Sequence, residues 1–135
     1  MKLHLTVALF GLLFATTLCA ASLADTKFEY GRGFYETPFE ETITTKTKGA
    51  TLVYTLDGSD PRESATAQRG TNPLRVKIDP TSREGRPLSP GGILRVYARK
   101  EGVKPSNVDT ATFLFAVQVR EQSHRSLGGR MAGGE

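Results

Sequence analysis

Hydrophobic and polar residues alternate along much of this chain with the two-residue period of β-strands. The alternation is clearest over residues 39–45, 74–78 and 94–99. The segments 51–56 and 110–115 are rich in β-branched and aromatic residues, and Gly, Pro, Asn and Asp interrupt the chain between the segments. No segment repeats apolar residues at the three- and four-residue spacing of an amphipathic helix over three turns. The pattern therefore predicts short strands joined by turns, with no long helix.

Successive side chains of a strand point to opposite sides, so each segment should present one apolar face to a core. The side chains expected to share inner faces are Leu52, Tyr54 and Leu56; Leu74, Val76 and Ile78; Leu94, Val96 and Ala98; and Phe113 and Phe115. Six or seven such strands between residues 25 and 116 predict an all-β domain of two packed antiparallel sheets.

The first 24 residues have the organisation of a secretory signal peptide. Lys2 precedes an apolar stretch over residues 5–18, and the small residues Ser22 and Ala24 stand at the −3 and −1 positions of a cleavage site before Asp25. We expect the chain to be secreted into the periplasm or the extracellular space, with no membrane contact after signal cleavage. An uncleaved N-terminal membrane anchor is the alternative.

Composition narrows the chemistry that the exported part can perform. The single cysteine is Cys19, within the predicted signal peptide, and the two histidines are His4 and His124. This distribution argues against disulfides, cysteine nucleophiles, Ser-His-Asp catalysis and zinc sites in the folded region. The formal net charge of +4 comes from basic residues scattered among acidic ones, so we expect no nucleic-acid partner. Residues 117–135, which end in a glycine-rich segment, are predicted to be a disordered tail.

The segment 49–61 reads GATLVYTLDGSDP. It resembles the GATIxYTLDGSxP signature of the chitobiase/β-hexosaminidase C-terminal-type module, also called the fibronectin type III-associated or glycoside-hydrolase-family-29-type β-sandwich domain. Weaker similarities follow in the same order as in that family. They lie at residues 32–36 and 38–39, at Gly70 with Pro73 and Leu74, at residues 93–98 and at residues 102–110. Together they cover roughly residues 27–116.

The resemblance implies an immunoglobulin/fibronectin-III-like antiparallel β-sandwich of six to seven strands, without catalytic residues, cofactor or metal. Modules of this kind typically accompany catalytic or adhesion domains in secreted bacterial proteins, often in polysaccharide breakdown. The resemblance therefore predicts a secreted non-catalytic accessory module with a structural or interaction role in a carbohydrate-related exported system. The expected partner is a polysaccharide or a neighbouring secreted protein, and we expect a monomer. The chain could also be a truncated piece of a larger secreted hydrolase or surface protein.

The family motif ends in a predicted turn formed by Asp57, Gly58, Ser59, Asp60 and Pro61. Asp accepts backbone hydrogen bonds, Gly allows a positive φ, and Pro cannot extend a strand ladder. A calcium site at Asp57 and Asp60 is the alternative, but a full cage would need more acidic residues nearby.

Weak carbohydrate binding is the alternative function, through side chains expected to be exposed. Tyr35 lies in a predicted turn, and Tyr97 falls on the polar face of its strand between Arg95 and Arg99. An exposed tyrosine ring could stack on a sugar, or it could simply pack under arginine stems.

An orphan glycosidase is a third, disfavoured interpretation. It would need two carboxylates at a suitable separation. The acidic residues available are Glu36, Glu40, Glu41, Asp57 and Asp60. We expect them on exposed strand faces and turns, where acidic residues serve solubility.

Overall fold

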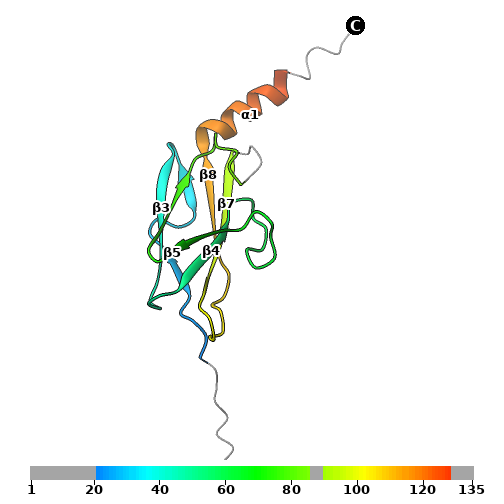
Figure 1. Cartoon of the computed structure of the whole chain (residues 1–135). Coiled ribbons are helices and arrows are strands. Elements are labelled where there is room, and N and C mark those ends of the chain that lie inside the picture. The colour runs from blue at the N-terminus through cyan, green and yellow to red at the C-terminus, as the bar shows by residue number, and fades with distance from the viewer. Residues whose placement is uncertain (1–20, 86–89, 129–135) are drawn as a thin grey trace, which may run out of the picture.

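The computed structural model describes residues 21–85 and 90–128, and within them eight strands form two sheets packed face to face (Figure 1). The first sheet contains, in spatial order, β1 (Thr26–Phe28), β3 (Phe39–Thr45) and β6 (Leu74–Ile78). The second contains, in spatial order, β2 (Gly33–Tyr35), β8 (Asp109–Phe115), β7 (Gly91–Arg99), β4 (Thr51–Thr55) and β5 (Gln68–Thr71). The predicted all-β sandwich is confirmed.

The described strands depart from the prediction in number and in one pairing. The additional short strands are β2, in a segment predicted as a break and turn, and β5, in a segment predicted as a polar loop. Strand β2 pairs with β8 in parallel, with Phe34 opposite Leu114, whereas the other paired strands run antiparallel. Strands of three or four residues that contain glycine give too little alternation to be recognised from the sequence.

The predicted inner faces are confirmed and form one core between the sheets. In β6, for example, Leu74, Val76 and Ile78 are buried while Arg75 and Lys77 are exposed. The buried core residues are Leu23, Ile43, Ala50, Leu52, Leu74, Val76, Ile78, Leu94, Val96, Ala98, Ala111, Phe113 and Phe115. Tyr54 and Leu56 are partly buried against this core, as predicted for their shared face.

Aromatic side chains fill the region of the core where β2, β3 and β8 meet. The rings of Tyr35 and Phe39 stack with centroids 4.2 Å apart, and Phe39 meets Phe113 edge-on at 5.4 Å. The hydroxyl of Tyr35 donates a 2.7 Å hydrogen bond to the backbone oxygen of Gly31. Burial, with a smaller contribution from the Glu41 carboxylate, raises the pKa of Tyr35 above its ordinary value.

Glu41 has a different environment from the one predicted. It is fully buried (0% exposed) rather than on a solvent-facing surface. Its Oε1 accepts hydrogen bonds from the backbone N–H groups of Glu29 at 2.7 Å and Tyr30 at 3.1 Å. Its buried Oε2 has no hydrogen-bond partner among the described residues. The carboxylate thus holds the segment that leaves β1 toward β2.

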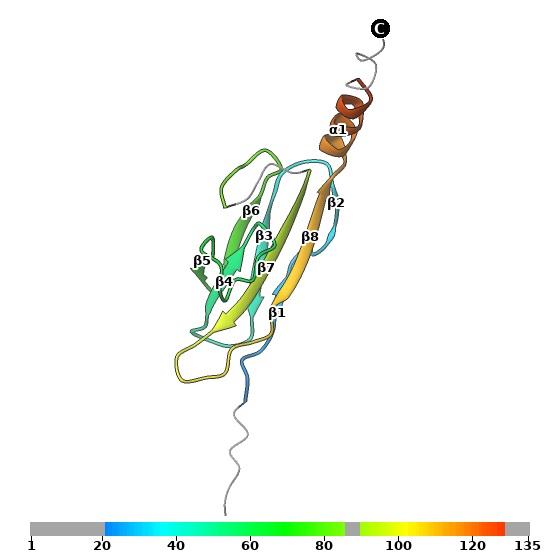
Figure 2. The ribbon, with the colours of Figure 1, turned by 90° about the vertical axis from the view of Figure 1, so that its right-hand side faces the viewer.

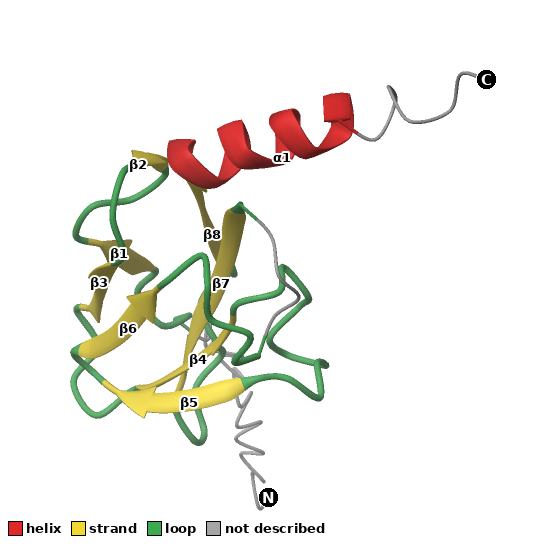
Figure 3. Ribbon diagram, turned by 90° about the horizontal axis from the view of Figure 1, so that it is seen from above, coloured by secondary structure: helices red, strands yellow, loops and turns green. Residues whose placement is uncertain are grey.

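The chain passes from β8 directly into helix α1 (Ala116–Gly128), which extends away from the strands (Figure 2, Figure 3). The sequence predicted a disordered tail over residues 117–135, but the structure is helical as far as Gly128. Residues 116–127 include helix-favouring Ala, Gln, Arg and Glu and contain no Gly or Pro. Val117 and Val119 are exposed, and the segment does not repeat apolar residues at three- and four-residue spacing over three turns, so periodicity does not reveal this helix.

Some expectations fall outside the described residues. Most of the predicted signal peptide, residues 1–24, and the last part of the predicted tail, residues 129–135, lie there. Within the described part of the chain, the one helix is neither long enough nor apolar enough to cross a bilayer.

Candidate functional site

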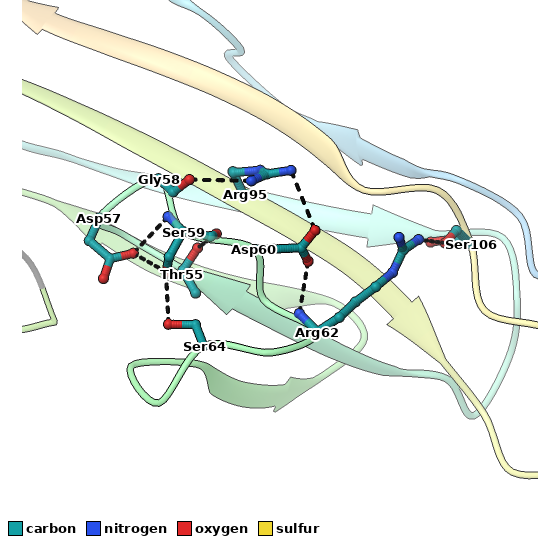
Figure 4. A network of polar contacts seen from close by, with 9 residues as sticks. All are labelled: Thr55, Asp57, Gly58, Ser59, Asp60, Arg62, Ser64, Arg95 and Ser106. Atoms are coloured by element: carbon teal, nitrogen blue, oxygen red, sulfur yellow. Dashed lines mark hydrogen bonds and ion pairs between the residues drawn. The ribbon is translucent and has the colours of Figure 1, made fainter.

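Residues 56–66, which contain the end of the family motif, form a polar loop over the outer face of the five-stranded sheet, directly after β4 (Figure 4). We call this segment the motif loop. The Asp57 carboxylate accepts a 2.9 Å hydrogen bond from the Ser59 backbone N–H, a second from the Ser59 hydroxyl, and a 2.7 Å bond from the Thr66 hydroxyl. Burial alone would raise the pKa of Asp57, but these hydrogen bonds outweigh it and hold the pKa below its ordinary value. The ionised Asp57 side chain therefore stabilises the conformation of its own loop.

Hydroxyl groups connect this turn to the strand beneath it. The Thr55 hydroxyl, almost fully buried, donates a 2.7 Å hydrogen bond to the backbone oxygen of Ser59. The Ser59 hydroxyl lies 2.8 Å from that of Ser64, which in turn lies 2.7 Å from that of Thr66. The loop is thus closed by its own side chains.

Asp60 anchors the second half of the loop. Its carboxylate accepts a 3.0 Å hydrogen bond from the Arg62 backbone N–H and lies 3.7 Å from the Arg95 guanidinium. The same guanidinium donates a 3.3 Å hydrogen bond to the backbone oxygen of Gly58. Arg95 of β7 therefore holds both sides of the turn, as Figure 4 shows.

Arg62 covers the centre of the outer face. Its guanidinium lies 5.5 Å from the ring centroid of Tyr97 and donates a 3.1 Å hydrogen bond to the backbone oxygen of Ser106. The hydroxyl of buried Ser106 accepts a 2.8 Å bond from the Ala98 N–H. Arg62 thus joins the motif loop to the turn between β7 and β8. Sequence reasoning missed this role, because no local pattern pairs Arg62 with an aromatic residue 35 positions later.

Gly58 adopts a φ of 80°, which confirms the positive φ predicted for this turn. A Cβ at this position would also lie 3.3 Å from side-chain atoms of Ile93.

We expect Gly58→Ala to lower the free energy of unfolding by about 1 kcal/mol or more, because alanine is strained at positive φ. Urea denaturation at neutral pH would measure the change. Gly102→Ala is the matched control: Gly102 has a φ of 72° and no atom near its added Cβ. A larger loss at Gly58 than at Gly102 would report the contact with Ile93, and an unchanged midpoint at Gly58 would contradict the account of this turn.

The alternative of a calcium site at Asp57 and Asp60 finds no support in the geometry of the loop. Both carboxylates accept hydrogen bonds from the loop itself, which is the turn role predicted for them. Among the described residues, no three His, Cys, Asp or Glu side chains are grouped so that they could hold a metal ion.

The four residues considered for glycan contact do not form one exposed surface. Tyr97 was expected to be exposed but is buried (8% exposed) under Arg62. Tyr35 was expected in a turn but lies in β2 with its ring in the aromatic core. Arg95 is half-exposed and contacts Asp60 and Gly58, and Arg99 is the one exposed member of the four. The exposure expected for Tyr97 is therefore absent, and Tyr35 is only partly exposed.

The acidic residues considered for hydrolysis are likewise dispersed. Glu40 lies on the outer face of the three-stranded sheet, 3.5 Å from Arg75, whereas Asp57 and Asp60 lie over the outer face of the other sheet. Glu36 is exposed after β2, and Glu41 is buried between the sheets. The structure does not bring two of these carboxylates together across a cleft.

The loop after β6 begins at Asp79, beside a small hollow between the sheets. The hollow is lined by Leu56, Lys77, Ile78, Asp79, Ser82, Glu84, Gly92, Leu94 and Phe113. Asp79 accepts hydrogen bonds from the Thr81 hydroxyl at 2.7 Å and the Thr81 N–H at 2.9 Å, and it lies 3.1 Å from the Lys77 ammonium. These contacts, those from Thr81 first, lower the pKa of Asp79 to about 2.

Because this pKa is depressed in the folded state, the stabilisation is present above the ordinary value of 3.8 and is lost as pH falls through about 2. We expect Asp79→Asn to cost about 1 kcal/mol at pH 7, less than the full shift implies because Lys77 is largely exposed. Most of this cost should be lost at pH 2, where Asp79 is about half protonated in the folded state. Urea denaturation at both pH values would measure it, with Glu36→Gln as control, since Glu36 is exposed and forms no ion pair with another described residue. A cost that is the same at both pH values would contradict an ionised Asp79 as its source.

Comparison with known families gives one match. The sequence model of the family described as Fn3 associated matches residues 42–113, more than half of the chain. The match begins within β3, contains the whole motif loop and ends within β8. No curated protein and no solved structure gives a significant match.

Proposed function

Because the chain belongs to the Fn3 associated family, we propose that it is a non-catalytic accessory module with a structural role in an exported, carbohydrate-related system. The observation that carries this proposal is that the polar side chains of the motif loop bond to the loop itself and to the rest of the domain. The groups that could have formed a site, Asp57, Asp60, Arg62 and Arg95, each hold the loop to itself or to the sheet. They serve the scaffold and present no reactive group to a substrate.

The positions of the chain ends support a spacer role within this proposal. The described chain enters at one end of the sandwich, and α1 leaves from the opposite end (Figure 1, Figure 2). The two sheets between these ends pack on one common core, so the sandwich would keep the segments on either side of it apart.

Secretion and the link to carbohydrate are further parts of the proposal. The charged start, apolar stretch and small residues of positions 1–24 support export to the periplasm or the extracellular space. The resemblance of residues 49–61 to the chitobiase-type signature supports a polysaccharide, or a secreted protein that acts on one, as the partner. Direct glycan binding through Tyr35 and Tyr97 is not favoured, because Tyr97 is buried under Arg62 and the partly exposed ring of Tyr35 stacks on Phe39.

The test is incubation of the purified protein with a panel of soluble and insoluble polysaccharides, with release of reducing ends as the readout. We expect no turnover. The variants Asp57→Asn and Asp60→Asn test whether either carboxylate contributes to any turnover that is observed. Turnover that either variant removes, while the thermal midpoint stays unchanged, would overturn the non-catalytic role.

A further inference from the structure

Strand β2 forms an open edge of the five-stranded sheet. It pairs with β8 on one side, and no other described strand pairs with it on the other. An edge strand offers unpaired backbone groups to a further strand, and proteins commonly protect such edges with charges or with short strands. This edge lies outside the family match, which covers residues 42–113.

The centre of this edge carries the most exposed large hydrophobic side chain among the described residues. Phe34 is 78% exposed. On the outer face, Phe34 lies opposite half-exposed Leu114 of β8. Leu114 in turn lies opposite Gly91 of β7, and Ile93, two residues further along β7, is 42% exposed. Phe34 therefore begins an apolar area that continues over three strands, of the kind that marks an interaction surface.

Opposite charges flank this phenylalanine at equal distances along the chain. Arg32 stands two residues before Phe34 and Glu36 two residues after it, and all three are exposed. Neither charge takes part in an ion pair among the described residues. If two copies of the segment 32–36 lie antiparallel with Phe34 opposite Phe34, the Arg32 of each copy therefore lies opposite the Glu36 of the other.

We propose that two copies of this chain associate by antiparallel pairing of their β2 strands about a two-fold axis at Phe34. This register places Phe34 opposite Phe34 of the second copy, and each Arg32 opposite the other copy's Glu36. It places Gly33, which has no side chain, opposite Tyr35 on the inner face. Each contact then occurs twice, as a two-fold interface requires. The two five-stranded sheets would form one continuous sheet, in place of the monomer expected from the sequence.

The interface is small, so the dimer should be weak. Two three-residue strands and their apolar surroundings fall short of the roughly 1,200 Å² of total buried surface typical of stable complexes. Sedimentation velocity over a concentration series that reaches the millimolar range should therefore show a monomer–dimer equilibrium, with dimer prominent only at the upper end.

Charge reversal tests the register directly. Arg32→Glu alone puts two carboxylates opposite each other at both ends of the strand pair, and Glu36→Arg alone puts two guanidinium groups there. Each variant should therefore raise the dimer dissociation constant by about tenfold or more. In a mixture of the two variants, every carboxylate of one copy faces a guanidinium of the other, so the mixture should associate as a heterodimer with near-original affinity. Lys46→Glu, which reverses an exposed charge at the turn after β3, is the matched control and should change nothing.

A second variant tests the apolar centre. Phe34→Ser should abolish the dimer while leaving the circular dichroism spectrum and the thermal midpoint unchanged, since the ring is exposed. Val103→Ser, which removes an exposed apolar side chain (38% exposed) at the turn after β7, is its control. A chain that stays monomeric at millimolar concentration would overturn the proposal. So would a dimer that neither Phe34→Ser nor the charge reversals weaken, or a mixture of the reversed variants that fails to associate.

Discussion

Phe113→Ala is expected to lower the free energy of unfolding by about 4 kcal/mol, which is typical of removing a fully buried aromatic side chain. Phe113 is 0% exposed and lies on β8. Its ring meets Phe39 edge-on at 5.4 Å and Tyr35 at 5.7 Å, so it joins the two sheets at their aromatic end. Truncation would remove those contacts and leave a cavity that rigid strands on both sides cannot close.

Guanidinium denaturation at a concentration where the chain is monomeric would measure this loss. Phe34→Ala is the matched control, because it removes the same group from a site that is 78% exposed and should cost less than about 0.5 kcal/mol. Similar losses for the two variants would contradict the assignment of Phe113 to the inner face and Phe34 to the outer face.

The inward position of Phe113 is the kind of feature that the sequence could predict. Alternation over 74–78 and 94–98 assigned their inner faces correctly, because a half-buried strand must separate apolar from polar side chains at every second residue. The positive φ of Gly58 followed from turn chemistry, which acts over neighbouring residues. Both features depend on local information.

The burial of Tyr97 could not be predicted from the neighbouring residues in the sequence. Alternation placed Tyr97 correctly on the outer face of β7, but its burial depends on Arg62 from the motif loop, and the outer-face residues Val53 and Thr55 are buried too. A loop that folds over a sheet converts an outer face into a second buried surface, and nothing in the strand's own sequence reports it. The exposure expected for Tyr97 is missing for this reason.

Glu41 shows a second limit. Glu41 shares its face of β3 with Ile43 and Thr45, while its charge led us to expect an exposed position. The fold keeps the side chain inside, where it is the acceptor for the Tyr30 N–H and a second acceptor for the Glu29 N–H, which also bonds the Thr42 backbone oxygen. A buried carboxylate is tolerated when it satisfies such groups, and that requirement is visible only after β1 and β3 are paired.

Glu41→Ala is therefore expected to lower the free energy of unfolding by about 3 kcal/mol. The Tyr30 N–H would lose its acceptor, at about 1 kcal/mol or more, and the Glu29 N–H would lose the shorter of its two bonds and keep the 3.0 Å bond to the Thr42 backbone oxygen. The missing methylenes would leave a cavity, which adds to the cost. Removal of a carboxylate whose Oε2 has no partner returns part of this cost, which keeps the expected loss below that of Phe113→Ala. Glu41→Gln, which retains the side-chain volume and one acceptor oxygen, should cost about 1 kcal/mol.

Glu40→Ala is the control for this prediction, because Glu40 is the preceding residue on the same strand but is exposed, and its contact with exposed Arg75 contributes little. Urea denaturation gives the free energies, and hydrogen exchange identifies their origin. The amide of Tyr30 should exchange faster in Glu41→Ala than in Glu40→Ala, since only the former variant removes its acceptor, whereas the amide of Glu29 keeps its bond to the Thr42 backbone oxygen. If Glu41→Ala were as stable as Glu40→Ala, or if the Tyr30 amide kept its protection, the carboxylate would not be what holds the segment between β1 and β2.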